Sequence, residues 1–216
     1  MDYVVSLVEV NLASRLADGT IRAYQQALTL HLMPINLIGV AISNAAFPQL
    51  TERLGEGRLD LFQKDLRSLL RIIFWMALPT SVVIFFTRGY IVHFIRNTGD
   101  QLMAGILGCL VVAILFRTIY HMAARAFYAR QDTKTPLYIS VFSISLNIAL
   151  AIILTMNLNM GAYGLAWAQS TVAVFEVVIL LLVMSKQMPR MFNRAFVTAI
   201  GKMIAASAVA GVVCYI

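Results

Sequence analysis

Long apolar stretches separated by short polar ones make up most of the chain. A helix needs about 20 mostly apolar residues to cross the hydrocarbon core of a bilayer. Six stretches meet that requirement, and a shorter one at residues 3–12 predicts the end of a truncated first helix. The pattern predicts an all-α polytopic membrane protein with six full transmembrane helices at residues 21–47, 69–86, 102–124, 137–156, 162–184 and 196–216.

The composition supports this prediction. Hydrophobic residues make up 60% of the chain and charged residues 12%, about half of what a soluble domain carries. The net charge of +7 would suit a nucleic-acid partner in a soluble protein, but here the basic residues lie between apolar runs. We therefore expect them to set the orientation in a membrane, and we expect no nucleic-acid partner.

The number of Lys and Arg residues is alternately low and high from one connecting segment to the next, as the positive-inside rule requires of a multi-pass protein. The poorer segments, predicted to face outward, hold Arg15, Arg22, Arg88 and Arg96. The richer segments, predicted to be cytoplasmic, hold Arg53, Arg58, Lys64, Arg67, Arg71, Arg125, Arg130, Lys134, Lys186, Arg190 and Arg194.

The longest cytoplasmic connection, residues 49–68, carries apolar residues at helical spacing. Leu59, Phe62, Leu66 and Leu69 would share one face of a helix, with charges of both signs around them. This spacing predicts a short amphipathic helix that lies on the membrane surface and connects two spans.

One face of the 21–47 helix is polar from end to end. Arg22, Gln25, Thr29, Asn36 and Ser43 fall within about 60° of the helix surface. Polar side chains are costly in a membrane, so this face indicates either a water-filled cavity or hydrogen bonds between helices.

Pro34 lies in the middle of the same helix. It removes a backbone hydrogen bond and should bend the helix near Leu30. A bend beside a polar face suits a hinge in alternating access, although proline kinks also occur in static membrane helices.

A second polar group lies on the 102–124 run and just beyond it. Arg117, His121, Arg125 and Tyr128 share one face, with Arg117 about 12 Å deeper than Arg125. Such a ladder would suit an anionic head group such as a diphosphate. The alternative is that Arg117 is a structural charge paired within the bundle, and Glu176 lies at a similar depth.

Catalytic arrangements are absent from the sequence. It contains no plausible Ser/His/Asp set, no glycine-rich phosphate loop and no His or Cys pair at metal-ligand spacing. We predict no enzyme activity, no cofactor and no metal site. Any transport would run on an ion gradient, the membrane potential or the supply of substrate.

Two motifs carry a resemblance to a known family. Residues 123–136 read AARAFYARQDTKTP, and residues 12–16 read LASRL, followed by Pro34, by GVAIS at 39–43 and by Pro48. In this order they resemble the second half of the MurJ/MviN lipid II flippases, members of the MOP (multidrug/oligosaccharidyl-lipid/polysaccharide) transporter superfamily. Nothing resembles the first half.

The resemblance implies two six-helix lobes around a cationic cavity. It implies transport of lipid-linked peptidoglycan precursor, lipid II, to the outer leaflet of the bacterial cytoplasmic membrane. Residues 1–185 would form the C-terminal lobe with its first helix truncated, and residues 186–216 a cytoplasmic loop and one additional helix. The implied partners are lipid II, membrane lipids and the missing N-terminal lobe.

One departure bears on the substrate. Many family members carry an arginine five residues before the proline, where this chain has Thr29. The charge would then come from Arg22 or Arg117. The leading hypothesis has the substrate bound by Arg22, Arg117 and Arg125, with the polar face around Thr29 and Asn36. The alternatives are an exporter of another polyprenyl-linked glycan, an exporter of a drug-like cation that uses Glu9 or Glu176, or an inactive fragment that needs its N-terminal lobe.

Overall fold

The computed structural model describes residues 11, 19–96, 100–188 and 194–215, and within these ranges every regular element is helical. Five helical segments are long and apolar enough to cross a membrane, which confirms the predicted all-α membrane fold. The elements are α2 (Thr20–Pro34), the π-helical segment η1 (Ile35–Val40), α3 (Ala41–Gly55), α4 (Leu59–Arg96), α5 (Gln101–Ala129), α6 (Lys134–Ile152), the π-helical segment η2 (Ile153–Asn157), α7 (Ala162–Gln187) and α8 (Arg194–Tyr215).

The spans are longer than predicted, because the helices continue into polar sequence beyond the apolar runs. The five candidate spans are Thr20–Gly55, Leu59–Ile95, Gln101–Ala129, Lys134–Asn157 and Ala162–Gln187. The sixth predicted span corresponds to helix α8, whose apolar part, Phe196–Val212, is too short to count among the candidate spans, so that α8 crosses the membrane stays a prediction. The predicted first helix at residues 3–12, with Glu9, and the LASRL motif lie almost wholly outside the described residues.

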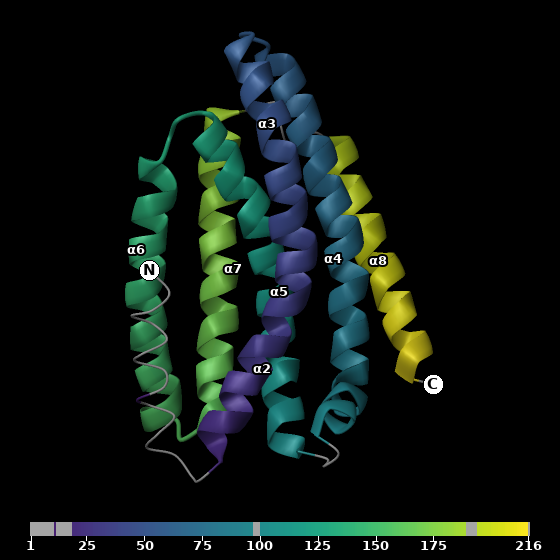
Figure 1. The fold of residues 1–216 in the computed structure, drawn as a ribbon, viewed down its shortest axis with the longest axis vertical. Coiled ribbons are helices and arrows are strands. Elements are labelled where there is room, and N and C mark those ends of the chain that lie inside the picture. The colour runs from purple at the N-terminus through teal and green to yellow at the C-terminus, as the bar shows by residue number, and fades with distance from the viewer. Residues whose placement is uncertain (1–10, 12–18, 97–99, 189–193, 216) are drawn as a thin grey trace.

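Helix α5 is the centre of the bundle (Figure 1). It packs against α2, η1, α3, α4 and α7. Helix α6 packs against α7 and barely contacts α5, whereas α8 packs against α4 at the other edge of the molecule. The bundle therefore leaves α6 held away from α5, and this separation makes room for the cavity described below.

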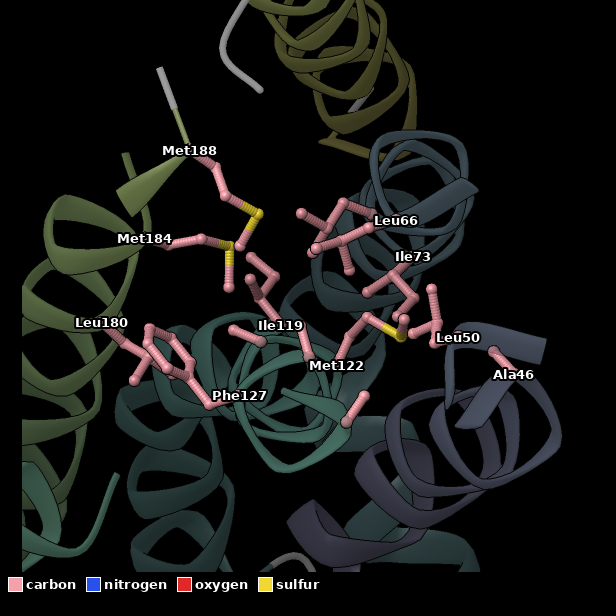
Figure 2. Packing of buried hydrophobic residues seen from close by; sticks show 14 of the residues in the cluster. Ala46, Leu50, Leu66, Ile73, Ile119, Met122, Phe127, Leu180, Met184 and Met188 are labelled. Atoms are coloured by element: carbon pink, nitrogen blue, oxygen red, sulfur yellow. The ribbon is translucent and has the colours of Figure 1, made fainter. Parts of the chain in front are cut away.

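Two apolar clusters hold the bundle together. One fills the end near the α3–α4 connection with buried side chains, most of them from α3, α4, α5 and α7, and Figure 2 shows them meeting around α5. The other joins α2, α5 and α7 toward the opposite end. Labelled members of the first cluster are Ala46, Leu50, Leu66, Ile73, Ile119, Met122, Phe127, Leu180, Met184 and Met188.

The predicted surface helix in residues 49–68 is wrong. Helix α4 runs without interruption from Leu59, and Phe62 and Leu66 are fully buried in the apolar cluster. Leu59, in contrast, is 57% exposed. The apolar face that the spacing predicted does form, but it packs against α3 and α5 and not against lipid. The reason is that α3 and α4 form one long hairpin, which an Arg53–Asp65 ion pair of 3.3 Å holds together.

The irregularity in the helix that starts with α2 lies after Pro34 and not near Leu30, where the bend was predicted. Residues up to Pro34 remain α-helical, and Ile35–Val40 form a π-helical segment before α3 begins. Figure 1 shows α2 and α3 inclined to each other on either side of this segment. A proline and a π-bulge are both recognised causes of helix bending.

The connections alternate between the two ends of the bundle as the charge pattern requires. The α3–α4 and α5–α6 connections lie at one end (Figure 1), and a hydrogen bond from Arg130 to Gln187 brings the end of α7 to them. The basic segments described in the structure thus share one end. The placement of that end in the cytoplasm stays a prediction.

Candidate functional site

A cavity of about 780 Å³ lies inside the bundle between α2, η1, α5, α6 and α7. Its volume is in the range of small-molecule sites. Its apolar walls come from leucine, isoleucine and valine side chains. The polar residues that line it are His31, Asn36, Arg117, Tyr120, His121, Tyr128, Thr133, Ser140, Ser143, Asn147, Gln169 and Glu176.

The deep part of the cavity is built around Arg117. One guanidinium nitrogen, Nη2, donates to Gln169 Oε1 at 2.7 Å. Arg117 Nε and Asn147 Oδ1 are buried atoms without a hydrogen-bond partner in the described structure. His31 is 4% exposed, and its Nδ1–H donates to the Leu28 carbonyl. Buried polar atoms without partners are unusual, so a water molecule or a polar ligand would complete them at this end of the cavity.

The outer part of the cavity holds Glu176, which is 8% exposed. Ser140 Oγ–H donates to Glu176 Oε1 across a long 3.5 Å, and the same hydroxyl lies 3.0 Å from Tyr120 Oη. Tyr128 and Thr133, both exposed, form the rim where α5 ends. The cavity therefore runs from a polar rim past a carboxylate to a guanidinium.

The motif at residues 123–136 builds the turn that carries this rim. Gln131 adopts a left-handed conformation with φ 60°, and Asp132 closes the start of α6. Its Oδ1 accepts from the Thr135 backbone N–H at 3.1 Å and its Oδ2 from the Thr135 hydroxyl at 2.7 Å. The bond from the Thr135 hydroxyl holds the pKa of Asp132 below its ordinary value. The motif thus fixes a turn between two helices.

The structure separates the predicted site residues into two groups. Asn36, Arg117 and His121 line the cavity. Arg22, Gln25 and Thr29 are exposed on α2 and do not line it, and the Thr29 hydroxyl donates to the Gln25 carbonyl at 2.9 Å.

Arg125 also lies outside the cavity, although it shares a helix face with Arg117 and His121. Its Nη2 donates to Asn44 Oδ1 of α3 at 2.6 Å, and its guanidinium stacks 5.4 Å from the centre of the Phe47 ring. Arg125 therefore joins the bent helix that starts with α2 instead of reaching into the space between α5 and α6.

Ser43 does not continue the exposed polar face of α2. Its side chain is buried, and its hydroxyl donates to the Gly39 carbonyl. The π-helical segment has more residues per turn than an α-helix, so it rotates every later position. Asn44 takes the exposed position that the sequence predicted for Ser43.

The proposed Arg117–Glu176 ion pair stays a prediction. Arg117 donates to Gln169, Glu176 accepts from Ser140, and both charged residues line the same cavity. Sequence reasoning overlooked Gln169, Asn147 and Ser140. A polar side chain inside an apolar run was the available signal for all three.

No group of three or more His, Cys, Asp or Glu side chains gathers at metal-ligand distance anywhere in the described ranges. The cavity is lined by hydroxyl, amide, imidazole, guanidinium and carboxylate groups. This set binds polar solutes through hydrogen bonds and charge.

The chain is similar to lipid II flippases along its whole length. The family profile described as "Lipid II flippase MurJ" matches residues 1–216. The probable lipid II flippase MurJ of Thermotoga maritima is 28% identical over 219 residues, covering 99% of this chain and 43% of the relative. That of Borreliella burgdorferi is 24% identical over 194 residues, covering 87% and 38%.

Two solved structures share the fold. "Lipid II flippase MurJ, inward closed conformation" superposes with a TM-score of 0.84 at 23% identity, over 98% of this chain and 44% of that one. A MOP superfamily transporter from Pyrococcus furiosus, described by the "reverse polarity of binding pocket", superposes with a TM-score of 0.77 at 13% identity, over 98% of this chain and 49% of that one.

This chain spans less than half the length of these relatives. With the family profile matched from the first residue to the last, the chain belongs to the MurJ lipid II flippase family, whose members are multi-pass transporters of the bacterial cytoplasmic membrane and not enzymes.

Proposed function

We propose that this chain forms the C-terminal half of a transporter that moves lipid-linked peptidoglycan precursor, lipid II, from the inner to the outer leaflet. Family membership over residues 1–216 supports the transport of lipid II. The coverage of 43% of the Thermotoga maritima relative supports the assignment to one half. The N-terminal lobe would be supplied by further sequence or by a partner chain.

The observation that carries this proposal is the exposed polar face of α2. Arg22, Gln25 and Thr29 are exposed there, although the helix crosses the membrane. A charged or amide side chain facing lipid is costly, so this face requires another lobe or a water-filled path beside it. A substrate path between two lobes satisfies that requirement.

The positive charges along the path suit a diphosphate. In our proposal Arg22 and Arg125 contact the diphosphate near opposite ends of the bent helix, with Thr29 and Asn36 between them. Arg117 and His121, placed inside the cavity, would add positive potential and hydrogen-bond donors beside the path. Pro34 and the π-helical segment would be the hinge of alternating access.

Complementation of a flippase-depleted bacterium tests the proposal. The chain is expressed alone and together with a matching N-terminal lobe, and membrane insertion is verified in both cases. We expect rescue with the partner lobe, and loss of rescue when Arg22→Ala and Arg125→Ala are combined. Failure of the inserted pair to rescue would contradict the proposal and leave an inactive fragment or a different substrate.

Thr29 favours a second candidate, an exporter of another polyprenyl-linked glycan or of a drug-like cation. It removes a positive charge at the position where the resemblance implies an arginine, and Glu176 places a negative charge inside the cavity. A Thr29→Arg variant separates the two candidates. Improved rescue of the depleted strain would favour lipid II, and loss of export of a cationic dye would favour the second candidate.

A further inference from the structure

Helices α4 and α8 lie side by side at one edge of the bundle (Figure 1). They run in the same direction. The ring centroids of Phe74 and Phe196 are 6.5 Å apart near the start of α8, and a Cβ atom at Gly211, near its end, would lie 3.1 Å from the Phe86 ring. Between these two contacts the helices leave a groove.

The groove has a volume of about 390 Å³ and almost wholly apolar walls. Small side chains on α8 leave the space, because two of the residues that line the groove are alanines on one face of that helix. The residues of the groove that matter below are Trp75 and Pro79 of α4, and Ala199, Lys202, Met203 and Ala206 of α8.

Lys202 is the one charged residue among the described residues that line the groove. It lies two turns from the start of α8 at Arg194, about 12 Å along the helix. The ion pairs found in the described part of the chain do not include it. An ammonium group at that depth is costly without an anionic partner. Its flexible stem leans toward the start of the helix, so a partner in the lipid head-group layer is within its reach.

We infer that this groove holds an anionic phospholipid from the leaflet at the basic end of the bundle. Its phosphate is bound by Lys202, and an acyl chain lies along Met203 and Ala206. Trp75 is 64% exposed and lines the same groove. An indole has an apolar body and one N–H donor, and it suits the boundary between acyl chains and head groups.

The charge near the groove favours an anionic lipid over a zwitterionic one. Arg71, Trp75 and Pro79 are exposed at a spacing of four residues, so they share one face of α4. Arg71 therefore adds a second positive charge on the head-group side of the groove. A zwitterionic head group would bring its own cation beside these two charges, whereas a phosphatidylglycerol head group brings only the phosphate.

Lys202 also argues against a protein segment as the occupant. A further helix seated in the groove would need a carboxylate at the depth of Lys202 to satisfy the ammonium group. The inferred lipid is resident and is not transported, so the inference goes beyond the proposed function. It rests on the prediction that α8 crosses the membrane beside α4.

The two tryptophans of the chain allow a direct test. Trp75 lines the groove, and Trp167 of α7 is 43% exposed and lies outside it. Trp167→Phe leaves Trp75 as the sole tryptophan, and Trp75→Phe leaves Trp167 as the matched control. The full chain is reconstituted in vesicles of phosphatidylcholine and phosphatidylglycerol, with bromine on the acyl chains of one lipid at a time. Quenching of fluorescence then gives the relative affinity for the two lipids at each tryptophan.

We expect phosphatidylglycerol to be preferred about fivefold at Trp75, and to show no preference at Trp167. Equal quenching of Trp75 by both brominated lipids would overturn the inference. Quenching of Trp167 but not of Trp75 would also overturn it, because it would show that protein covers the groove.

Substitution of the lysine tests its role. Lys202→Gln should lower the preference at Trp75 to the level seen at Trp167. Lys134→Gln removes the same charge from the exposed start of α6 and should leave the preference unchanged. Lys202→Arg keeps the charge and should keep the preference, and it serves if Lys202→Gln fails to fold. A preference that survives Lys202→Gln, or that Lys202→Arg abolishes, would overturn the assignment of the phosphate to Lys202.

A variant that fills the groove separates a seated lipid from lipids that merely gather near a charge. Ala206→Phe keeps Lys202 and occupies the space of the acyl chain, so it should abolish the preference at Trp75. Ala210→Phe, at an exposed position of α8 outside the groove, is the control and should retain it. An unchanged preference in Ala206→Phe would overturn the inference of a seated lipid.

Discussion

Gly39 in the π-helical segment lies directly against Thr118 of α5, with no space for a side chain between them. A Cβ atom at position 39 would be 3.0 Å from the Thr118 Cα atom and 3.1 Å from its carbonyl oxygen. Thr118 is itself fully buried, and its hydroxyl donates to the Ile114 carbonyl. The contact involves backbone atoms on one side, so it fixes where the bent helix crosses the central helix.

A larger residue at Gly39 should therefore force the two helices apart. We expect Gly39→Val to lower the free energy of unfolding by about 1–3 kcal/mol, the usual cost of overpacking. Thermal unfolding in detergent measures it. Gly201→Val on α8 is the matched control, because a Cβ there meets nothing within 4 Å. Equal stability of the two variants would show that the helices separate without cost.

The continuous start of α4 leads to a second prediction. Phe62→Ala removes a fully buried ring from the apolar cluster and should cost about 3–5 kcal/mol. Leu59→Ala, at an exposed position in the same helical turn, should change stability by no more than about 0.5 kcal/mol. A helix lying on the membrane would lose similar stability at both positions. Chemical unfolding of both variants decides between the arrangements.

The sequence located the helices because each apolar run is long and its connections are short. The predicted ends of the helices were less accurate. Helix α4, for example, continues from Leu59 to Arg96 through charged residues, and a search for apolar runs leaves such residues out. It also assigned Phe62 and Leu66 to a membrane surface. Periodicity shows that two residues share a face, but only the packing of α3 beside α4 shows what that face contacts.

The candidate site was predictable in its residue types and only partly in its arrangement. Arg117, His121 and Asn36 do line one cavity. Equal depth along the helices suggested Glu176 as the partner of Arg117, and this pairing stays a prediction. The guanidinium donates to Gln169, which lies about two turns from Glu176 on α7. The depth of a residue in the membrane does not specify which way its helix is rotated. Long side chains also lean toward the start of their helix, so two residues at equal depth need not meet. The separation of α6 from α5, which creates the cavity, left no trace in the apolar pattern.

The turn after α5 should show a specific acid dependence. Asp132 accepts two hydrogen bonds from Thr135. Asp132→Asn keeps one acceptor oxygen but removes its charge, and should cost at most about 1 kcal/mol at neutral pH, because hydrogen bonds to a charged acceptor are stronger than those to a neutral amide. The pKa of Asp132 is lowered in the folded protein. Its contribution is therefore present above the ordinary pKa of about 4 and disappears as the pH falls below it.

Thermal unfolding of the wild-type and Asp132→Asn proteins between pH 7 and pH 3 measures this dependence. The difference between their unfolding temperatures should be constant near neutrality and shrink in acid. Asp60→Asn, on the exposed first turn of α4, provides the matched control. A difference that persists unchanged to pH 3 would show that the charge of Asp132 does not stabilise the turn.

The chain contains a guanidinium–amide hydrogen bond inside the bundle and another at its surface. They allow the strength of the same kind of hydrogen bond to be compared in two environments. Arg117 bonds Gln169 at 2.7 Å in a partly buried place, and Arg125 bonds Asn44 at 2.6 Å in an exposed one. Double-mutant cycles with Arg→Met and amide→Leu changes should give about 1–2 kcal/mol of coupling inside and less than about 0.5 kcal/mol at the surface. Water replaces the lost partner only at the exposed site. Equal coupling energies would mean that water reaches Arg117 freely, and the cavity would then be a hydrated vestibule in which neither charge is fixed by its surroundings.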